Sequence, residues 1–219
     1  RYAVFPTHGS TNYGSGHAGV GVSVGTNGIS IFEHSNNYLP SLLVYDATLV
    51  GWNHIAVVYV NGQPRLYLNG VLVRTGLQSA YTVHPSADVS AIDGLNYGPF
   101  MGNVDEVRVW DYVRTSSQIM ANKNNGISGN ESGLVGYWRF NEGSGTTVYD
   151  KTANENNGTL RNGAYFMVRT IDLKSPVDNQ YIATSTPTFV WETAIDTGIG
   201  FQKYQIFVDG TIKADGLTD

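Results

Sequence analysis

The chain has 219 residues, of which 41% are hydrophobic and 14% charged, so it is long and apolar enough to bury a sizeable core. Its formal net charge of −5 provides no basic surface, and no run reaches the roughly 18 apolar residues of a membrane span, so we expect neither nucleic-acid binding nor membrane insertion. The absence of cysteine excludes disulfides, thiolate metal sites and cysteine nucleophiles, while 26 glycines and 14 tyrosines indicate a turn-rich all-β protein.

The chain begins within a predicted strand. Arg1-Tyr2-Ala3-Val4 lacks a signal-peptide pattern, and we interpret the sequence as a mature fragment or an internal piece of a longer chain. An Asn-Gly pair at 27–28 then separates two further strands, because Asn and Gly tolerate the positive φ of a tight hairpin turn. Each of these strands places alternate apolar residues on one face: Val20, Val22, Val24, Ile29 and Ile31.

Residues 51–76, GWNHIAVVYVNGQPRLYLNGVLVRTG, contain two more Asn-Gly pairs between alternating strands. The pattern predicts a meander of strand, turn, strand, turn and strand. In its first strand, Ile55, Val57 and Tyr59 share one face, and apolar residues also occupy the other face. We interpret His54, which alternation places in this strand, as a packed and hydrogen-bonded residue rather than a base or metal ligand.

One segment has a helix signal. Thr115 and Gln118 fit a capping box, in which the threonine caps the helix and the glutamine reaches back to it. Ile119 and Met120 follow, and Asn125-Gly126 is a plausible stop. We expect two or three helical turns here, and strands again over 134–166.

The sequence pattern changes near residue 170. The start of an immunoglobulin-like or fibronectin type III-like domain is indicated by a Ser-Pro pair, a predicted strand at Trp191 and another from Tyr204 to Val208. Such a domain needs about seven strands, and the chain stops after three or four. The incomplete sandwich would expose sheet edges, so either the sequence continues in a longer chain or another chain completes it.

Three motifs in the first part of the chain carry a family resemblance. WNHIAVVYVNGQPRLYLNGVLV, FMGNVDEVRVWDYVRTSSQI and GLVGYWRFNEGSGTTVYDKTANENNGTL resemble hallmarks of the laminin G-like (concanavalin A-like, pentraxin-like) jelly-roll domains, over about Arg1 to Val168. The resemblance implies an antiparallel jelly-roll β-sandwich over 1–168, followed by a partial fibronectin type III-like or immunoglobulin-like β-sandwich over 169–219. In many relatives the GLVGYW element opens the domain; here we expect 134–166 to fold back and complete the first sandwich, unless more of it lies upstream.

The densest charge cluster contains Asp105, Glu106 and Arg108. Some enzymes of concanavalin-like fold hydrolyse glucans with two carboxylates on one face of a sheet, and retaining glycosidases hold the pair about 5–5.5 Å apart. Adjacent strand residues face opposite ways, so Asp105 and Glu106 do not suit that role. We expect Glu106 to pair with Arg108 and the protein to be non-catalytic.

The loop YDKTANENNGT suggests a cation site. Calcium takes six to eight oxygen ligands, and a glycine-bounded loop of Asp and Asn can supply several, although the same composition is common in metal-free turns. The resemblance implies calcium at such a loop, with Asp150 matching the family's aspartate and Asp105 contributing from the neighbouring strand. Composition alone adds two further predicted ligands, Asn154 and Asn157.

Glycan recognition would use exposed aromatic rings beside hydrogen-bonding groups. Three loops offer these, at residues 8–17, 33–38 and 81–97. The predicted ligand-binding residues are Tyr13, His17, Tyr38, Tyr81 and Tyr97. We discount a zinc site made of His8, His17 and His34, because their spacing is not that of a zinc motif.

These observations favour a non-catalytic, extracellular module of a larger secreted or cell-surface protein. It would bind a glycan or a cell-surface protein, with calcium as a structural ion. One alternative is a structural subunit of a surface layer, sheath or filament that self-assembles through the partial second domain. The other is a glycoside hydrolase or lyase of concanavalin A-like fold, in which Glu106 would act.

Overall fold

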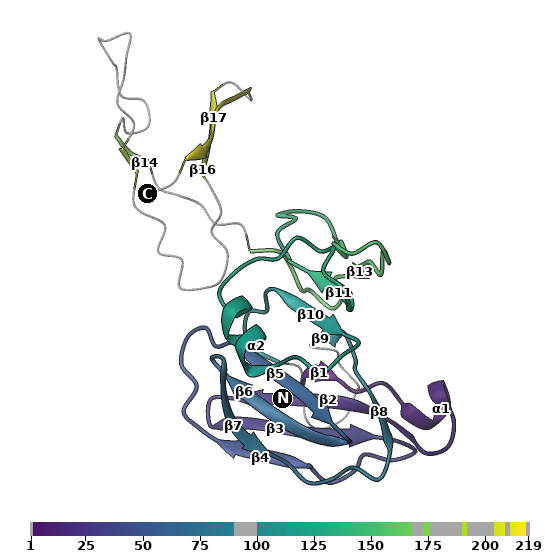
Figure 1. Cartoon of the computed structure of the whole chain (residues 1–219). Coiled ribbons are helices and arrows are strands. Elements are labelled where there is room, and N and C mark those ends of the chain that lie inside the picture. The colour runs from purple at the N-terminus through teal and green to yellow at the C-terminus, as the bar shows by residue number, and fades with distance from the viewer. Residues whose placement is uncertain are drawn as a thin grey trace, which may run out of the picture.

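The computed structural model describes residues 2–89 and 100–167, and the backbone of four short strands beyond them. Two β-sheets face each other in the described N-terminal part (Figure 1). The larger sheet has the order β4-β3-β2-β1-β9, with β8 parallel to β2, over Leu43–Asp46, Gly28–His34, His17–Gly25, Tyr2–Phe5, Asp88–Val89 and Thr82–His84. The smaller sheet is a meander of β5 (Ile55–Val60), β6 (Gln63–Leu68) and β7 (Val71–Thr75).

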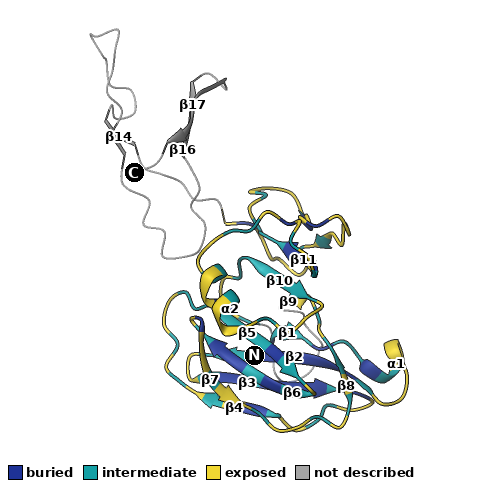
Figure 2. Cartoon of the chain, in the orientation of Figure 1, coloured by how far each residue is buried: buried dark blue, intermediate teal, exposed yellow. Residues whose placement is uncertain are grey.

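The core lies between the two sheets, as the alternation predicts. Val22 pairs with Ile31 and Val24 with Ile29, so the apolar residues of β2 and β3 point to the same side. They pack against Leu66, which is fully buried, and against the predicted inner face of β5. Figure 2 shows the buried residues running along β2, β3 and β6. The all-β sandwich is therefore confirmed.

The turns between these strands have the predicted chemistry. Asn61 and Asn69 adopt φ of 49° and 52°, and the glycine after each is also in the left-handed region. Two positive φ values in succession are what a two-residue hairpin of primed type requires. The meander from β5 to β7 follows directly from this local sequence.

The predicted helix is α2 (Ser116–Asn122), and it explains why β5 is apolar on both faces. Thr115 and Gln118 form the expected capping box. Ile119 packs on Val58 and Tyr67, which lie on the side of the small sheet that faces away from the core. The helix ends at Asn122, three residues before the predicted stop. A second helix, α1 (Gly9–Tyr13), was not predicted; it is one short turn capped by His8.

The segment 134–166 folds back, but onto a different partner from the one expected. Strand β11 (Leu134–Trp138) pairs with β10 (Val107–Trp110), and β12 (Thr147–Val148) pairs with β13 (Gly158–Thr159). Among the described residues neither pair hydrogen-bonds to the two sandwich sheets. The expectation that this segment supplies sandwich strands is therefore wrong. We call residues 134–160 the β11–β13 lobe.

Beyond residue 167, the structure describes two antiparallel strand pairs. These are β14 (Leu173–Ser175) with β15 (Val190–Trp191), and β16 (Tyr204–Val208) with β17 (Thr211–Leu217). The strands predicted at Trp191 and over 204–208 are present. A second immunoglobulin-like domain over 169–219 stays a prediction, as does the domain boundary at 168.

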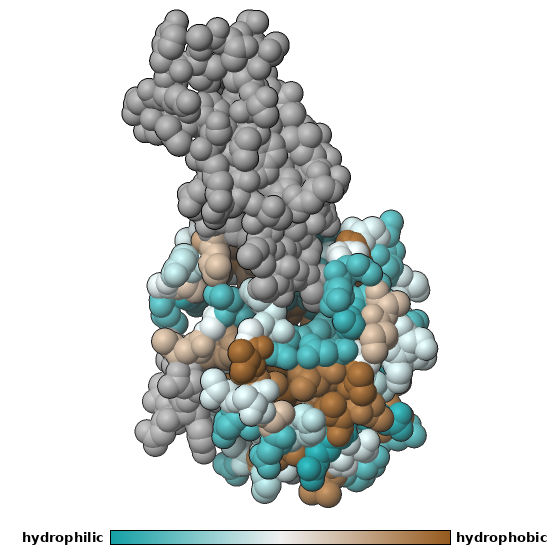
Figure 3. Space-filling model, turned by 90° about the vertical axis from the view of Figure 1, so that its left-hand side faces the viewer, coloured by the Kyte–Doolittle hydropathy of each residue, from teal (hydrophilic) through white to brown (hydrophobic). Residues whose placement is uncertain are grey.

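Two sandwich edges expose apolar side chains. Strands β4 and β7 lie at the edges of their sheets and contact each other. Val44, Val71 and Leu72 are exposed on them. Figure 3 shows hydrophobic residues gathered on the face of the molecule that lies to the left in Figure 1.

None of the helices in the described part of the chain is long and apolar enough to cross a membrane.

Candidate functional site

Loops that are far apart in the sequence meet at one end of the six-stranded sheet. The parallel strands β2 and β8 both begin there, and the antiparallel strand β3 ends there. Across these strands, Gly19 pairs with His34 on one side and with His84 on the other. The Oγ atoms of Ser10 and Ser35 lie 2.8 Å apart, so the first two predicted ligand-binding loops touch. We call this region the sheet end.

Tyr13, His17 and His84 form one group of rings at the sheet end. The rings of Tyr13 and His84 stack with centroids 3.8 Å apart and planes inclined by 11°. His17 Nδ1 lies 2.8 Å from His84 Nε2, within hydrogen-bond distance. Tyr13 remains 44% exposed. An exposed ring held flat by a second ring is a rigid platform for an apolar surface.

Tyr38, His34 and His8 form a second group of rings. Tyr38 stacks on His34 with centroids 4.2 Å apart, and the His8 ring lies 4.5 Å from that of His34. Behind them, buried Tyr2 and Phe32 continue the aromatic surface along the sheet. Tyr13 and Tyr38 lie in separate loops of the sequence. In the folded chain each ring stacks on a histidine, Tyr13 on His84 and Tyr38 on His34.

Glycines on β2 make room for these rings. A Cβ on Gly21 would lie 2.4 Å from Cζ of Phe32, and a Cβ on Gly19 would lie 2.1 Å from the carbonyl oxygen of Thr7. Such separations are far below van der Waals contact, so both positions need glycine. The Phe32 ring and the segment that leads into α1 therefore lie directly on the backbone of β2.

A buried carboxyl group anchors the third loop from beneath. Glu33 is 1% exposed and points into the sandwich from β3, where Ser79 Oγ donates to it at 2.8 Å and Tyr59 Oη at 3.1 Å. Burial raises the pKa of Glu33, although both hydroxyl donors oppose the shift. Ser79 Oγ also accepts the backbone N–H of Tyr81. Glu33 thereby fixes the loop that leads into β8.

The pKa values of two site histidines are lowered. Burial, followed by the nearby His8, lowers the pKa of His34, against a hydrogen bond with the Pro6 backbone. Burial and His17 lower the pKa of His84. Both rings therefore favour the neutral form at physiological pH.

The predicted ligand-binding residues divide into three groups. Tyr13 and His17 lie together, Tyr38 lies in the second ring group, and Tyr81 is half-buried in the third loop. Tyr97 lies outside the described residues. Sequence reasoning left His84 and His34 out of the predicted ligand set. The only available signal was the number of histidines in these loops.

Asp150 organises the predicted calcium loop through hydrogen bonds. Its Oδ1 accepts the backbone N–H groups of Tyr137 and Thr152 at 2.9 and 3.0 Å. Its Oδ2 accepts Thr152 Oγ1, the Asn156 backbone N–H and the Asn156 side-chain amide at 2.9, 3.0 and 3.2 Å. Burial acts to raise the pKa of Asp150, but these donors outweigh it and lower that pKa. Both oxygens thus face N–H and O–H donors.

Two of the other predicted calcium ligands, Asn154 and Asn157, make hydrogen bonds within the protein. Asn157 Oδ1 accepts the backbone N–H of Asp150, and Asn154 donates its side-chain amide to a carbonyl. An isolated β-bridge joins Asp150 to Trp138 on one side of β11. Strand β10, which follows Asp105 in the chain, pairs with the other side of β11. Within residues 2–89 and 100–167, no three histidine, aspartate or glutamate side chains are placed to hold a metal ion together. Both oxygens of Asp150 already accept hydrogen bonds from the protein, and calcium at this loop stays a prediction.

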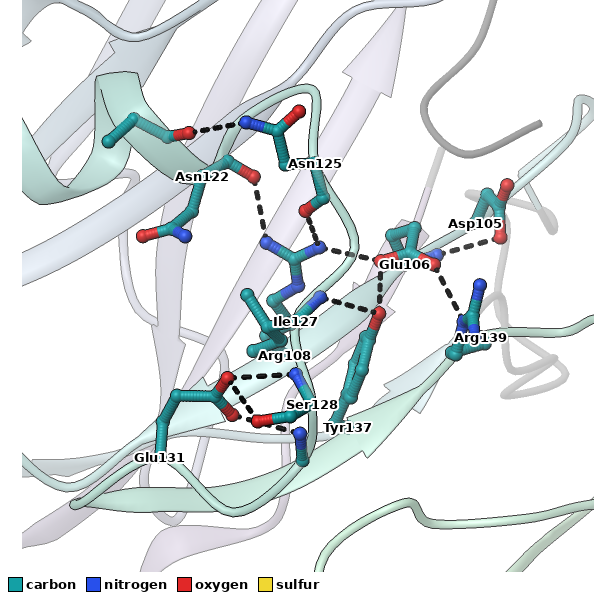
Figure 4. Close-up of polar contacts among 12 residues, drawn as sticks. Asp105, Glu106, Arg108, Asn122, Asn125, Ile127, Ser128, Glu131, Tyr137 and Arg139 are labelled. Carbon is teal, nitrogen blue, oxygen red and sulfur yellow. Dashed lines mark hydrogen bonds and ion pairs between the residues drawn. The ribbon is translucent and has the colours of Figure 1, made fainter. Parts of the chain in front are cut away.

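Glu106 is engaged in a buried ion-pair network (Figure 4). Its carboxylate is 2.6 Å from Arg108 Nη2 and 3.3 Å from Arg139 Nε, and Tyr137 Oη donates to it. Arg108 also donates to the backbone carbonyls of Asn122 and Asn125. The predicted pairing of Glu106 with Arg108 is confirmed. The cluster is a staple between the β11–β13 lobe and the segment after α2.

Two details of that region differ from expectation. Glu106 has a φ of 53°, so it lies outside the strand, which begins at Val107. His54 is half-buried, and its pKa is lowered to about 4, by burial first and then by Arg108 and Lys123. Its Nδ1 has no hydrogen-bond partner among the residues that the structure describes. His54 is therefore packed as predicted, but that nitrogen is not hydrogen-bonded.

Comparison with known proteins agrees with this architecture. Residues 3–120 match the family model of the concanavalin A-like lectin/glucanases superfamily. A search of curated proteins finds no match. Among solved structures, the chain is similar to a candidate carbohydrate-binding protein from Bacteroides ovatus, with 20% identity and a TM-score of 0.50. The similarity covers 72% of this chain and 47% of that protein, so the chain spans about half of its relative's length.

At 20% identity the structural likeness shows the fold alone. The family match is broader, because it spans more than half of the chain and includes both sheets of the sandwich. The protein belongs to the concanavalin A-like lectin/glucanases superfamily.

Proposed function

We propose that this protein is a non-catalytic carbohydrate-binding module and that its glycan binds at the sheet end. The observation that carries the proposal is the exposed Tyr13 ring, held flat on His84 where three loops meet. The C–H face of a sugar ring stacks on an aromatic face, and polar groups around it take the hydroxyls. Exposed polar side chains are available on this loop and on the neighbouring loop of Tyr38: Thr11, Asn12, Ser15, Asn36 and Asn37.

The ligand class has independent support. The family model is that of lectins and glucanases, and the Bacteroides ovatus relative is a candidate carbohydrate-binding protein. A binding role is favoured over hydrolysis because Glu106 is neutralised by two arginines and largely withdrawn from solvent. Glycosidases need one carboxyl group free to protonate the leaving oxygen and a second near the sugar.

A glycan array on the wild type, Tyr13→Ala and Tyr165→Ala tests the proposal. Loss of one stacked ring should weaken binding by about tenfold, the equivalent of roughly 1.4 kcal/mol. Tyr165 is 80% exposed and lies outside the sheet end, so its replacement is the matched control and should leave binding unchanged. Equal loss in both variants, or none in either, would remove the sheet end from consideration.

Calcium remains a prediction from the family resemblance, and the proposed binding does not depend on it. The donors around Asp150 stabilise a carboxylate without a cation. Running the array in calcium and again in chelator separates the cases. Equal binding in both conditions supports a calcium-independent site, whereas loss of binding in chelator supports the ion.

An extracellular setting and a cell-surface partner are part of the proposal. The alternative of a self-assembling surface subunit gains some support from the exposed apolar edge at Val44, Val71 and Leu72. Analytical ultracentrifugation decides between them. A concentration-independent monomer that binds glycan favours the module, and reversible assembly lost in Leu72→Lys favours the subunit.

A further inference from the structure

Histidine is concentrated at the sheet end. The whole chain has five histidines, and four of them lie here: His8, His17, His34 and His84. They come from the segment before α1, from β2, from β3 and from β8, so only the tertiary structure brings them together. Imidazole changes charge near neutral pH, so this clustering concentrates the protein's pH response at one place.

Two hydrogen bonds at the sheet end require an uncharged imidazole. His8 caps α1, because its Nδ1 accepts the backbone N–H of Thr11 at 3.2 Å. His17 Nδ1 and His84 Nε2 are 2.8 Å apart while the ring centroids are 5.0 Å apart, so the rings meet edge to edge through these nitrogens. A protonated imidazole has two N–H donors and no acceptor. Full protonation therefore removes the cap and also breaks the link between His17 and His84.

Both hydrogen bonds support the same residue. Tyr13 is the last residue of α1, which His8 caps, and its ring lies on His84, which His17 holds. The backbone before and within α1 is pressed against β2 at Gly19 and Gly9, with Ser10 bonded to Ser35 as the further tie. Helix α1 has only five residues, so losing its cap removes a large share of its own hydrogen bonding.

We propose that these histidines form a proton-sensitive clasp that closes the binding platform at neutral pH and opens it on acidification. Protonation breaks the two hydrogen bonds, places like charges on His17 beside His84 and on His8 beside His34, and releases α1 with Tyr13. The inference rests on the proposed function for its ligand: a glycan held at neutral pH would be released as the pH falls through the histidine range.

The surrounding groups and the direction of linkage agree with the clasp. The lowered pKa values of His34 and His84 mean that the closed form binds protons less readily than the opened form. The closed form is therefore favoured above the ordinary histidine value of 6.5 and lost below it. The other titratable side chains on the elements and loops packed here are four tyrosines and two carboxyl groups, the inward-facing one of β3 and the one of β9: Tyr2, Tyr13, Tyr38, Tyr81, Glu33 and Asp88.

The first measurement needs no ligand. Long-range proton–nitrogen NMR spectra report the protonation of each imidazole between about pH 8 and pH 5, and proton–proton contacts report whether Tyr13 still lies on His84. We expect the Tyr13–His84 contacts to disappear as the second proton enters the His17–His84 pair. Persistence of these contacts with both rings protonated would overturn the proposal.

The second measurement is glycan affinity against pH. Wild-type affinity should fall by about tenfold or more between roughly pH 7.5 and pH 5. The double variant His8→Asn and His17→Asn keeps a cap acceptor and leaves the His84 ring under Tyr13. The new amide can accept a hydrogen bond from protonated His84, so the affinity of this variant should change much less with pH. His54→Gln lies outside the sheet end and should keep the wild-type profile; thermal melting at neutral pH confirms that each variant is folded.

The two measurements fail independently. If no glycan binds at any pH, the proposed function fails, and the NMR titration alone decides whether the clasp opens. If glycan binds but the double variant loses affinity on acidification as steeply as the wild type, the clasp is wrong and the proposed function stands.

Discussion

Replacing Asp150 with alanine should destabilise the protein by about 3–5 kcal/mol, because it leaves three backbone N–H groups without their acceptor. These are the N–H groups of Tyr137, Thr152 and Asn156, and Asp150 itself is 7% exposed. Each unsatisfied buried donor costs about 1–3 kcal/mol, and the outermost recovers part of this from water. At about 2–4 °C per kcal/mol for a chain of this size, the melting temperature should fall by roughly 10 °C.

Thermal unfolding in calcium and in chelator is the informative assay. If hydrogen bonds hold the loop, Asp150→Ala lowers the melting temperature equally in both conditions. If a calcium ion holds it, the variant is destabilised in calcium but not in chelator, and chelator lowers the wild type to the level of the variant. That second pattern would refute the reasoning from hydrogen bonds. Asp46→Ala, at the exposed end of β4, is the control and should change stability by less than about 0.5 kcal/mol.

The Asp150 carboxylate also makes the stability of the protein depend on pH. The pKa of Asp150 is lower in the folded protein than the ordinary 3.8, so its contribution is complete above that value and is lost as the pH falls through the folded pKa. The stability difference between wild type and Asp150→Ala, measured by denaturant unfolding, should therefore shrink on acidification below about pH 4. A constant difference down to pH 2 would contradict the assignment of the shift to Asp150.

Three further substitutions test the core and the staple. Tyr137→Phe removes the hydroxyl that donates to buried Glu106 and should lower the free energy of unfolding by about 1–2 kcal/mol in urea titrations; an unchanged midpoint would deny the staple a stabilising role. Glu33→Gln keeps a partner for both hydroxyls but cannot ionise, and the folded pKa of Glu33 is raised, so the stability of the wild type relative to this variant should decline as the pH rises above about 4.5; parallel pH curves would contradict this. Leu66→Ala empties a fully buried position between the sheets and should cost about 2–5 kcal/mol by chemical denaturation; a loss below about 1 kcal/mol would place Leu66 outside the core.

Local patterns were sufficient for most of the sandwich. The alternation of Val20, Val22 and Val24 identified the inner face of β2 because side chains of a strand alternate between two faces wherever the strand lies. The Asn-Gly turns and the Thr115–Gln118 capping box were also predictable, because each is decided by φ values and hydrogen bonds within four residues.

Local patterns did not predict the long-range contacts of two segments. Residues 105–106 read as part of a strand, yet Glu106 turns into the left-handed region where it meets Arg108, Arg139 and Tyr137. The Asp and Asn of the 150–157 loop read as cation ligands by composition. In the folded chain the carboxylate is enclosed by donors from β11 and from its own loop, and no rule of spacing predicts that.

By itself, the sequence determined the all-β class, the strand faces, the meander turns, the capped helix α2 and three loops rich in tyrosine and histidine, since all of these depend on residues near one another in the chain. Only the tertiary structure decided that the three loops share one end of a sheet. The parallel pairing of β8 with β2 brings His84 to His17 across 67 positions, and the close approach of backbones at Gly19 lays α1 and Tyr13 over them. Strand order is set by the packing of whole sheets, and local periodicity does not predict it.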